Sequence, residues 1–316
     1  MQKSLQVSSS PHIRARSTTR RIMLDMCIAM MPVAVAAVIF FGFSAFSLML
    51  IAVGSAIVFE FAYQKITHAK TTIRDLSAVV TGLLVAFNLP ANAPAWIAVF
   101  GSAIAIVLIK QIFGGLGQNF MNPAMAARAI LFLSFASIMT NYPVPSPHIA
   151  RVAAAVDTVA GVTPLSVSDY SVPLMDLFIG NIPGVLGETS KLAILLGACY
   201  LLLRGVISWK IPLSFIMTVF ICYLVKDGTQ AAIYQVLSGG LFLGAFFMAT
   251  DYATSPITSL GKIIMGIGCG IVLFVIRAYA AYPEGCSFAI LFMNVATPLI
   301  DKWTLPHPFG EVKANG

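Results

Sequence analysis

The sequence predicts an all-α integral membrane protein with about ten transmembrane helices, arranged as two inverted five-helix repeats. Hydrophobic residues fill 59% of the 316 positions and charged residues only 10%, against about 25% charged in an ordinary soluble domain. Basic residues gather in alternate connectors, and one short pattern recurs in both halves. The net charge of +7 is therefore attributed to cytoplasmic loops and not to nucleic-acid binding.

Ten apolar runs, separated by polar, Gly or Pro residues, are candidate spans because a helix needs roughly 20 apolar residues to cross a bilayer. Four of them are short or interrupted, which is typical of broken or re-entrant helices. In chain order the runs cover residues 22–42, 44–64, 76–89, 95–113, 122–140, 190–208, 211–225, 230–250, 260–281 and 286–300.

The distribution of Lys and Arg predicts that both termini are cytoplasmic. With the N-terminus inside, fourteen of the 19 basic residues fall inside, four fall outside and Arg128 lies within the fifth span. Trp96, Trp209 and Trp303 fall at span ends, as expected for residues at the membrane interface.

These assignments divide the chain into five parts. A cytoplasmic N-terminal arm (1–21) precedes the first membrane repeat (22–140), and an extracytoplasmic connector (141–189) leads to the second repeat (190–300) and a cytoplasmic tail (301–316). The connector is rich in proline and is not a hidden span. The arm shows no cleavage site, so we expect the first span to be retained.

The recurring pattern supports the internal repeat. The segment 120–124 (FMNPA) returns as 292–296 (FMNVA), each in the fifth span of its half, and the interrupted stretches 82–90 and 244–256 also correspond. Two units with an odd number of spans must have opposite orientations in the bilayer. Folds of this kind bind substrates or cofactors near discontinuous helices at the repeat interface.

Cysteine and histidine give no metal signal. The five cysteines are widely separated and form no CxxC or Cys/His cluster, so we expect no zinc or iron–sulfur site and interpret most of them as small packing residues. No metal ligand and no catalytic side chain is assigned.

Ionisable residues inside spans are candidates for function. Asp25 lies near the arginine-rich arm, and pairing with Arg20 or Arg21 is the favoured interpretation. Glu60 precedes Lys65 by about one turn and is expected to reach the interface with it. A cation path is the alternative for both, and Asp251, which closes an interrupted span, is the better candidate for that path.

Three further polar residues have two open interpretations. Asn122, Asn294 and Arg128 either line a cofactor or ion cavity or form hydrogen bonds between closely packed helices.

One turn of the outer connector has no spanning role. It begins with Asp157, contains Gly161 and ends with Thr163 before Pro164. A plain surface turn is the commoner explanation for such a segment. The alternative is a modification site, for which Gly161 and Pro164 would provide an exposed, kinked turn that presents the Thr163 hydroxyl to an enzyme outside the cytoplasm.

Over nearly its full length the chain resembles a family of membrane redox pumps. The residues that carry the resemblance are 10–14 (SPHIR), 114–128, the 157–163 turn and 251–256 (DYATSP). The family includes the D subunit of the Rnf complex, the ferredoxin:NAD oxidoreductase that pumps Na⁺ or H⁺, and the B subunit of the Na⁺-pumping NADH:quinone reductase. By family analogy the fold is similar to that of urea transporters.

The resemblance implies a covalent flavin mononucleotide (FMN), linked by a phosphodiester to Thr163. The family pattern is Asp-x-x-Ser/Thr-Gly-Ala-Thr. This chain has Ala160 and Val162 at two of those positions and retains Asp157, Gly161 and Thr163. The family also implies a noncovalent riboflavin, for which the sequence assigns no residue.

The resemblance further implies a place in a bacterial inner-membrane complex. The expected partners are the A, B, C, E and G subunits of Rnf, with the FMN-bearing G subunit as electron donor, and ferredoxin and NAD indirectly. The lipid bilayer and the transported ion, Na⁺ or H⁺, are also expected partners. A ten-span channel or transporter for a small solute is the alternative function, and a passive scaffold is a third, although neither explains the turn at Thr163.

Overall fold

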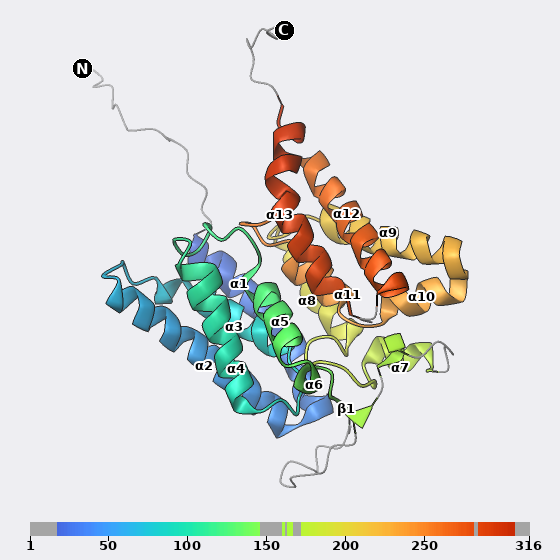
Figure 1. The fold of residues 1–316 in the computed structure, drawn as a ribbon, viewed down its shortest axis with the longest axis horizontal. Helices are drawn as coiled ribbons and strands as arrows, with labels where there is room; N and C mark the ends of the chain where they lie inside the picture. Colours follow the sequence, from blue (N-terminus) through green and yellow to red (C-terminus); the bar gives the residue numbers. More distant parts are fainter. Residues whose placement is uncertain (1–17, 146–159, 162, 167–171, 281–283, 307–316) are drawn as a thin grey trace, which may run out of the picture.

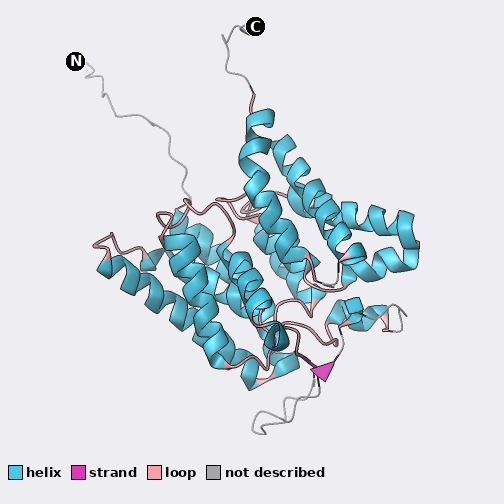
Figure 2. Ribbon diagram, viewed as in Figure 1, coloured by secondary structure: helices cyan, strands magenta, loops and turns pink. Residues whose placement is uncertain are grey.

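The computed structural model describes residues 18–145, 160–161, 163–166, 172–280 and 284–306. The described chain is mostly helical, with one very short two-stranded sheet (Figure 2). The helices form two groups that meet at the centre of the molecule: α1–α6 from the first half of the chain, and α8–α13 from the second (Figure 1).

The first group begins with two long helices and continues with shorter ones. The loop between α2 and α3 contains the 3₁₀ turn η1 (Ile73–Asp75), and η2 continues α4 as a π-helix. The bounds are α1 (Thr19–Phe41), α2 (Phe43–Ile66), α3 (Ser77–Phe87), α4 (Ala95–Ala103), η2 (Ile104–Gln111), α5 (Pro123–Ser134) and α6 (Ala136–Met139).

The connector contains little regular structure. Strand β1 (Tyr142–Pro143) pairs antiparallel with β2 (Ala160–Gly161), and η4 (Pro164–Ser166) and α7 (Leu174–Ile179) follow. In Figure 1, β1 and α7 lie together at one edge of the molecule, below both helix groups.

The second group also combines long and broken helices. The bounds are α8 (Lys191–Leu203), α9 (Lys210–Asp227), α10 (Thr229–Leu237), α11 (Leu241–Leu243), the π-helix η5 (Gly244–Met248), α12 (Ser259–Tyr279) and α13 (Cys286–Thr304).

A helical segment therefore lies over each of the ten apolar runs predicted from the sequence. In the described residues, α1, α2 and α12 are long and apolar enough to cross a membrane by length and composition, and α10 with 241–248, bent by 65°, would make a fourth span. Four other apolar helical segments are shorter: Ser77–Phe87, Ala95–Gln111, Pro123–Ser134 and Lys191–Leu203.

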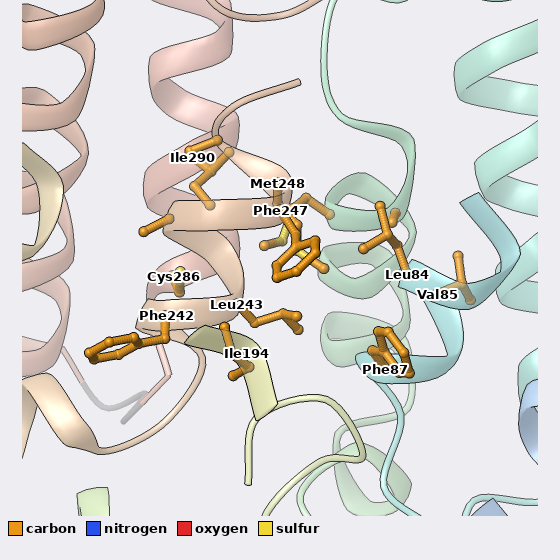
Figure 3. Close-up of a cluster of buried hydrophobic side chains, with 14 of the residues drawn as sticks. Leu84, Val85, Phe87, Ile194, Phe242, Leu243, Phe247, Met248, Cys286 and Ile290 are labelled. Atoms are coloured by element: carbon orange, nitrogen blue, oxygen red, sulfur yellow. The ribbon is translucent and has the colours of Figure 1, made fainter. Parts of the chain in front are cut away.

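The buried core lies where the two groups meet. Figure 3 shows Leu84 and Phe87 of the first group facing Leu243, Phe247 and Met248 of the second. Helices α1 and α8 pack closely at Gly197, where an added Cβ would lie 2.0 Å from the Ala29 carbonyl oxygen. A small residue at such a crossing lets two membrane helices pack backbone to backbone.

Candidate functional site

The breaks in the helices bring the connector into the interior. After α3 ends at Phe87, the connector pairs with the chain: Leu186 N donates to Leu89 O at 3.0 Å, and Gly187 N donates to Phe87 O at 2.9 Å. A Cβ on Gly187 would lie 2.4 Å from the Phe87 Cβ, so only glycine fits. This close approach places the next residue, Glu188, deep between the two helix groups.

Glu188 meets an arginine there. Arg128, on α5, is 5% exposed. Its Nη1 donates to Glu188 Oε1 at 2.5 Å and to Asn88 Oδ1 at 2.8 Å, and its Nη2 pairs with Glu284 Oε2. A planar guanidinium can serve several acceptors at once. The group Arg128–Glu188–Glu284, called here the charge cluster, joins α5 to the segments that precede α8 and α13.

The break between α10 and α11 lies against this cluster. A broken helix leaves carbonyl and amide groups without helical partners, and inside a membrane these must be satisfied by the protein. Arg277 Nη1 donates to Gln235 O at 2.7 Å and Nη2 to Ser238 O at 3.2 Å, while Gly240 N donates to Glu284 Oε1 at 3.1 Å. Arg277 and Glu284 thus stabilise the 65° bend.

Thr163 lies beside the cluster. It lines a small cavity of about 10 Å³ together with Tyr142, Glu188, Thr189 and Glu284, among others. Burial raises the pKa of the Tyr142 phenol above its ordinary value. Gly161 pairs with Tyr142 in the short sheet, and Asp157 lies outside the described residues.

The expectation that Thr163 occupies an exposed turn is wrong. The residue is 7% exposed, because the turn folds inward against the connector and the α10–α11 break. Leu165 reaches Gly239, where an added Cβ would meet the leucine Cδ1 at 2.5 Å. Gly239 has φ +66°, a backbone conformation that favours glycine.

The two asparagines of the recurring pattern lie close together but in different settings. Asn122 is the N-cap of α5: its Oδ1 accepts from Ala124 N and Met125 N, and its Nδ2 donates to Met248 O at 3.2 Å. Asn294 lies inside α13, and with its amide oriented to satisfy both atoms, its oxygen accepts from Asn122 N at 3.1 Å. Helix-to-helix bonding, one of the two open interpretations, is therefore present at both.

The difference between the two segments follows from one residue. Pro123 lacks an N–H and suits the first position of a helix, so α5 begins there. The second segment has Val295 instead, and α13 continues through it.

A second, larger cavity of about 70 Å³ lies at the N-terminal end of α5. Lys110, Asn119, Asn122, Thr250 and Asp251 contribute polar atoms to its lining. Asp251 follows η5, as expected for a residue that closes an interrupted span, and its Oδ2 accepts from Thr254 Oγ1 at 3.4 Å.

Polar contacts connect the two cavities. From the charge cluster, Arg128 reaches Asn88, whose Nδ2 lies 3.9 Å from Met248 Sδ. The carbonyl of Met248 accepts from Asn122, which lines the larger cavity. This series of contacts follows the broken ends of α3, α5 and η5 through the middle of the molecule.

Glu60 does not pair with Lys65, contrary to the expectation from their spacing. Its side chain is fully buried, and its Oε2 accepts from Lys110 Nζ at 2.6 Å while its Oε1 accepts from Thr72 Oγ1 at 3.0 Å. Lys110 also donates to Ser77 Oγ at 2.6 Å. Glu60 faces inward on α2 toward η2, whereas Lys65 lies on the exposed side.

Asp25 also pairs with a residue other than the one expected from the sequence. Its carboxylate accepts from Tyr200 Oη at 2.8 Å and from Arg204 Nη2 at 3.2 Å, and within the described residues its ion pair is with Arg204 instead of Arg20 or Arg21. Both partners lie at the end of α8, because the crossing of α1 and α8 turns Asp25 toward the second helix group.

Sequence reasoning missed five charged residues: Glu188, Glu284, Lys191, Arg277 and Lys110. Glu188, Glu284, Lys191 and Lys110 are buried in the structure, and Arg277 is half-buried. A signal is present, because only 12 Asp and Glu occur in the chain and two of them stand immediately before predicted spans.

In the described residues no group of three or more His, Cys, Asp and Glu side chains could hold a metal ion.

Comparison with known proteins gives the family. A model of the NQR2, RnfD, RnfE family matches residues 6–310. The chain belongs to the NQR2, RnfD, RnfE family. Its similarity to individual members extends over nearly the whole length of both chains.

Three relatives illustrate this. The chain is 48% identical to the D subunit of the Na⁺-translocating ferredoxin:NAD⁺ oxidoreductase complex of Acetobacterium woodii, over 98% of this chain and 96% of the relative. It is 39% identical to the D subunit of the proton-translocating ferredoxin:NAD⁺ oxidoreductase complex of Clostridium ljungdahlii, over 96% of each. It is 34% identical to the D subunit of the ion-translocating oxidoreductase complex of Escherichia coli, over 97% of this chain and 99% of the relative.

Proposed function

We propose that this chain is the D subunit of an ion-translocating ferredoxin:NAD⁺ oxidoreductase (Rnf) complex in the bacterial inner membrane. Relatives with that name match it over nearly their full length, and apolar helices make up most of the described chain. Its partners are then the A, B, C, E and G subunits of Rnf, with ferredoxin and NAD acting through them. Electron flow through the complex drives Na⁺ or H⁺ across the membrane.

The second part of the proposal is that Thr163 carries FMN through a phosphodiester. The observation that supports it is the position of Thr163, beside the buried charge cluster and at one end of the polar contacts through the molecule. When bound, FMN accepts and donates electrons, and the protein supplies position and electrostatics. Glu188 and Glu284 keep Arg128 in place near the threonine, and the connector excludes water from it.

The small cavity sets a limit on what it holds. About 10 Å³ is roughly the space of one water molecule, so the cavity as it stands admits neither the flavin ring nor the phosphodiester. Because Thr163 is 7% exposed, attachment requires 163–166 to lie farther out than in this structure. Two residue pairs join the adjacent β2 to β1, so little structure opposes that displacement.

The larger cavity does not fit riboflavin as it stands. Its volume of about 70 Å³ is well below the 300–1,000 Å³ typical of pockets for drug-sized ligands. Noncovalent riboflavin therefore remains an expectation from the family resemblance.

For ion movement, the structure favours Asp251 over the other two candidates. Asp25 and Glu60 are each committed to an ion pair, whereas Asp251 lines the larger cavity. We propose that Asp251 is the residue through which this protein contacts the transported ion.

The helix packing supports the proposed repeat. In the first half, α2 packs against α3 and α4, and α5 packs against α4–η2; in the second half, α9 packs against α10 and α12, and α13 packs against α12. The proposed architecture is ten spans in two inverted repeats, similar to that of urea transporters.

In-gel flavin fluorescence of the denatured chain tests the flavin proposal. The wild-type band should fluoresce and Thr163→Ala should not, because a covalent phosphodiester survives denaturation. Thr158→Ala is the matched control and should keep the signal; Thr158 lies outside the described residues. Fluorescence that persists in Thr163→Ala would move the linkage elsewhere, and a dark wild-type band would favour the solute-transporter alternative.

A further inference from the structure

The segment 163–166, called here the closing segment, forms part of the wall of the small cavity. Its first two residues are buried and Leu165 is half-buried. All three line the cavity together with Glu188 and Glu284 of the charge cluster. The closing segment therefore contributes to the burial of these two carboxylates.

An apolar contact holds the closing segment against the second helix group. Leu165 packs onto Gly239 at the α10–α11 break, so closely that an added Cβ there would lie 2.5 Å from Leu165 Cδ1. Just before the segment, β2 is joined to β1 by two residue pairs, and a pairing this short adds little stability by itself. The contact of Leu165 with Gly239 is therefore the one whose loss we expect to release the segment.

The polar groups that share the cavity with the closing segment favour contact with water. Thr189 is 1% exposed, and in the part of the chain that the structure describes its Oγ1 makes no hydrogen bond. Burial of such a hydroxyl, and of the carboxylates Glu188 and Glu284, is unfavourable. Outward movement of the segment would admit water to all three groups. This gain offsets part of the apolar contact that Leu165 loses, which makes local opening accessible without global unfolding.

We infer that the closing segment moves in and out over the charge cluster, and that the packing of Leu165 on Gly239 holds it in. In the outer position Thr163 is exposed and the two carboxylates are hydrated; in the inner position all are buried. The inference rests on the proposed function for what Thr163 carries, since FMN attachment then takes place in the outer position. Access to Thr163 is thus controlled by two residues that do not carry the modification.

The rate at which a thiol at position 163 reacts measures this access. Thr163→Cys is placed in a full-length chain whose single other cysteine is Cys269, and the detergent-solubilised complex is treated with a thiol reagent. Leu165→Ala should speed labelling of the thiol at 163 by on the order of tenfold, because opening then breaks less apolar contact. Leu174→Ala is the matched control, since Leu174 lies in the same connector, is 47% exposed and is not part of the cavity lining.

A pair of glycines tests the contact from its other side. Gly239→Ala should also speed labelling, because the new methyl group would displace Leu165, and the increase should disappear when Leu165→Ala is already present. Gly205→Ala is the matched control. Gly205 has the same φ of +66° as Gly239, but nothing lies within 4 Å of its added Cβ, so it introduces the backbone strain without the displacement.

Two outcomes would overturn the inference. One is an equal labelling rate at position 163 with and without Leu165→Ala. The other is a parallel rise in the labelling of Cys269, which is fully buried, because that would indicate general loosening in place of local opening.

The labelling experiment is independent of the flavin, because Thr163→Cys removes the proposed attachment point. In-gel fluorescence of the wild-type chain decides separately whether the linkage exists. In a chain that does carry flavin at Thr163, Leu165→Ala should acquire fluorescence faster after induced synthesis than Leu174→Ala. Equal rates of acquisition would overturn the control of attachment by Leu165.

Discussion

Two buried carboxylates of this chain pair with basic residues on helices that lie far apart in the sequence. Glu60 meets Lys110, and Asp25 meets Arg204, at separations of 50 and 179 residues. Such pairs contribute little net stability compared with apolar replacements, but removal of one member leaves an unpaired charge. This asymmetry makes each pair testable.

Lys110→Met should destabilise the protein by about 3–5 kcal/mol, because Glu60 would be left as an uncompensated buried carboxylate. Lys110→Met combined with Glu60→Gln should recover most of that loss, since glutamine still serves Thr72 and Gln64. Apparent Tm in detergent, followed as a double-mutant cycle, measures the coupling. Lys65→Met, at an exposed site on the same helix as Glu60, is the control. Additive effects of Lys110→Met and Glu60→Gln would show that the pair is not coupled.

The sequence reveals that these residues are unusual but not which partners they have. Asp25, Glu60 and Asp251 stand out because the rest of their runs is apolar. Their partners depend on helix rotation and crossing, which the spacing along one helix does not contain. Hence a local pairing such as Glu60 with Lys65 is wrong, while Asn122 does lie where helices meet, because Pro123 marks a helix start.

At the scale of helices and strands, the breaks rather than the continuous helices position the site. The break after α3 receives the connector through Gly187, and the α10–α11 break is held by Arg277 and Glu284. Apolar runs predict the locations of these helices well. The breaks are visible as Gly and Pro interruptions, but the way the connector fills them arises from long-range backbone pairing that periodicity does not reveal.

Gly187→Ala should destabilise the protein by about 1–3 kcal/mol, because the new methyl group would overlap Phe87. The displacement should also move Glu188 away from Arg128. Gly54→Ala is the matched control: nothing lies within 4 Å of its added Cβ, so a gain of about 0.5–1 kcal/mol is expected from helix propensity. Comparison of their Tm values decides the matter, and equal stability of the two variants would contradict the close packing at Phe87.

For the molecule as a whole, the basic residues predict that 141–189 is extracytoplasmic and that both termini are cytoplasmic. Single cysteines at Ser146 and Ser168, in a background without native cysteines, should react with a membrane-impermeant reagent only from outside. Both positions lie outside the described residues. Thr67→Cys, exposed between α2 and α3, should react only from the cytoplasm. Labelling of Ser146→Cys and Ser168→Cys from the cytoplasmic side would reverse the topology and remove the basis for a flavin at Thr163.

The charge cluster has a mechanical consequence. Arg128 belongs to the first helix group, whereas Glu188 and Glu284 stand directly before α8 and α13 of the second. Rocking of one group against the other would pull this arginine from its carboxylates inside a low-dielectric interior, at a cost of several kcal/mol. The charge cluster thus holds the two helix groups in a fixed relative position. A protein whose halves do not move against each other keeps its two membrane faces at a constant separation. This suits the transfer of electrons between fixed centres better than the alternating exposure of a transported solute.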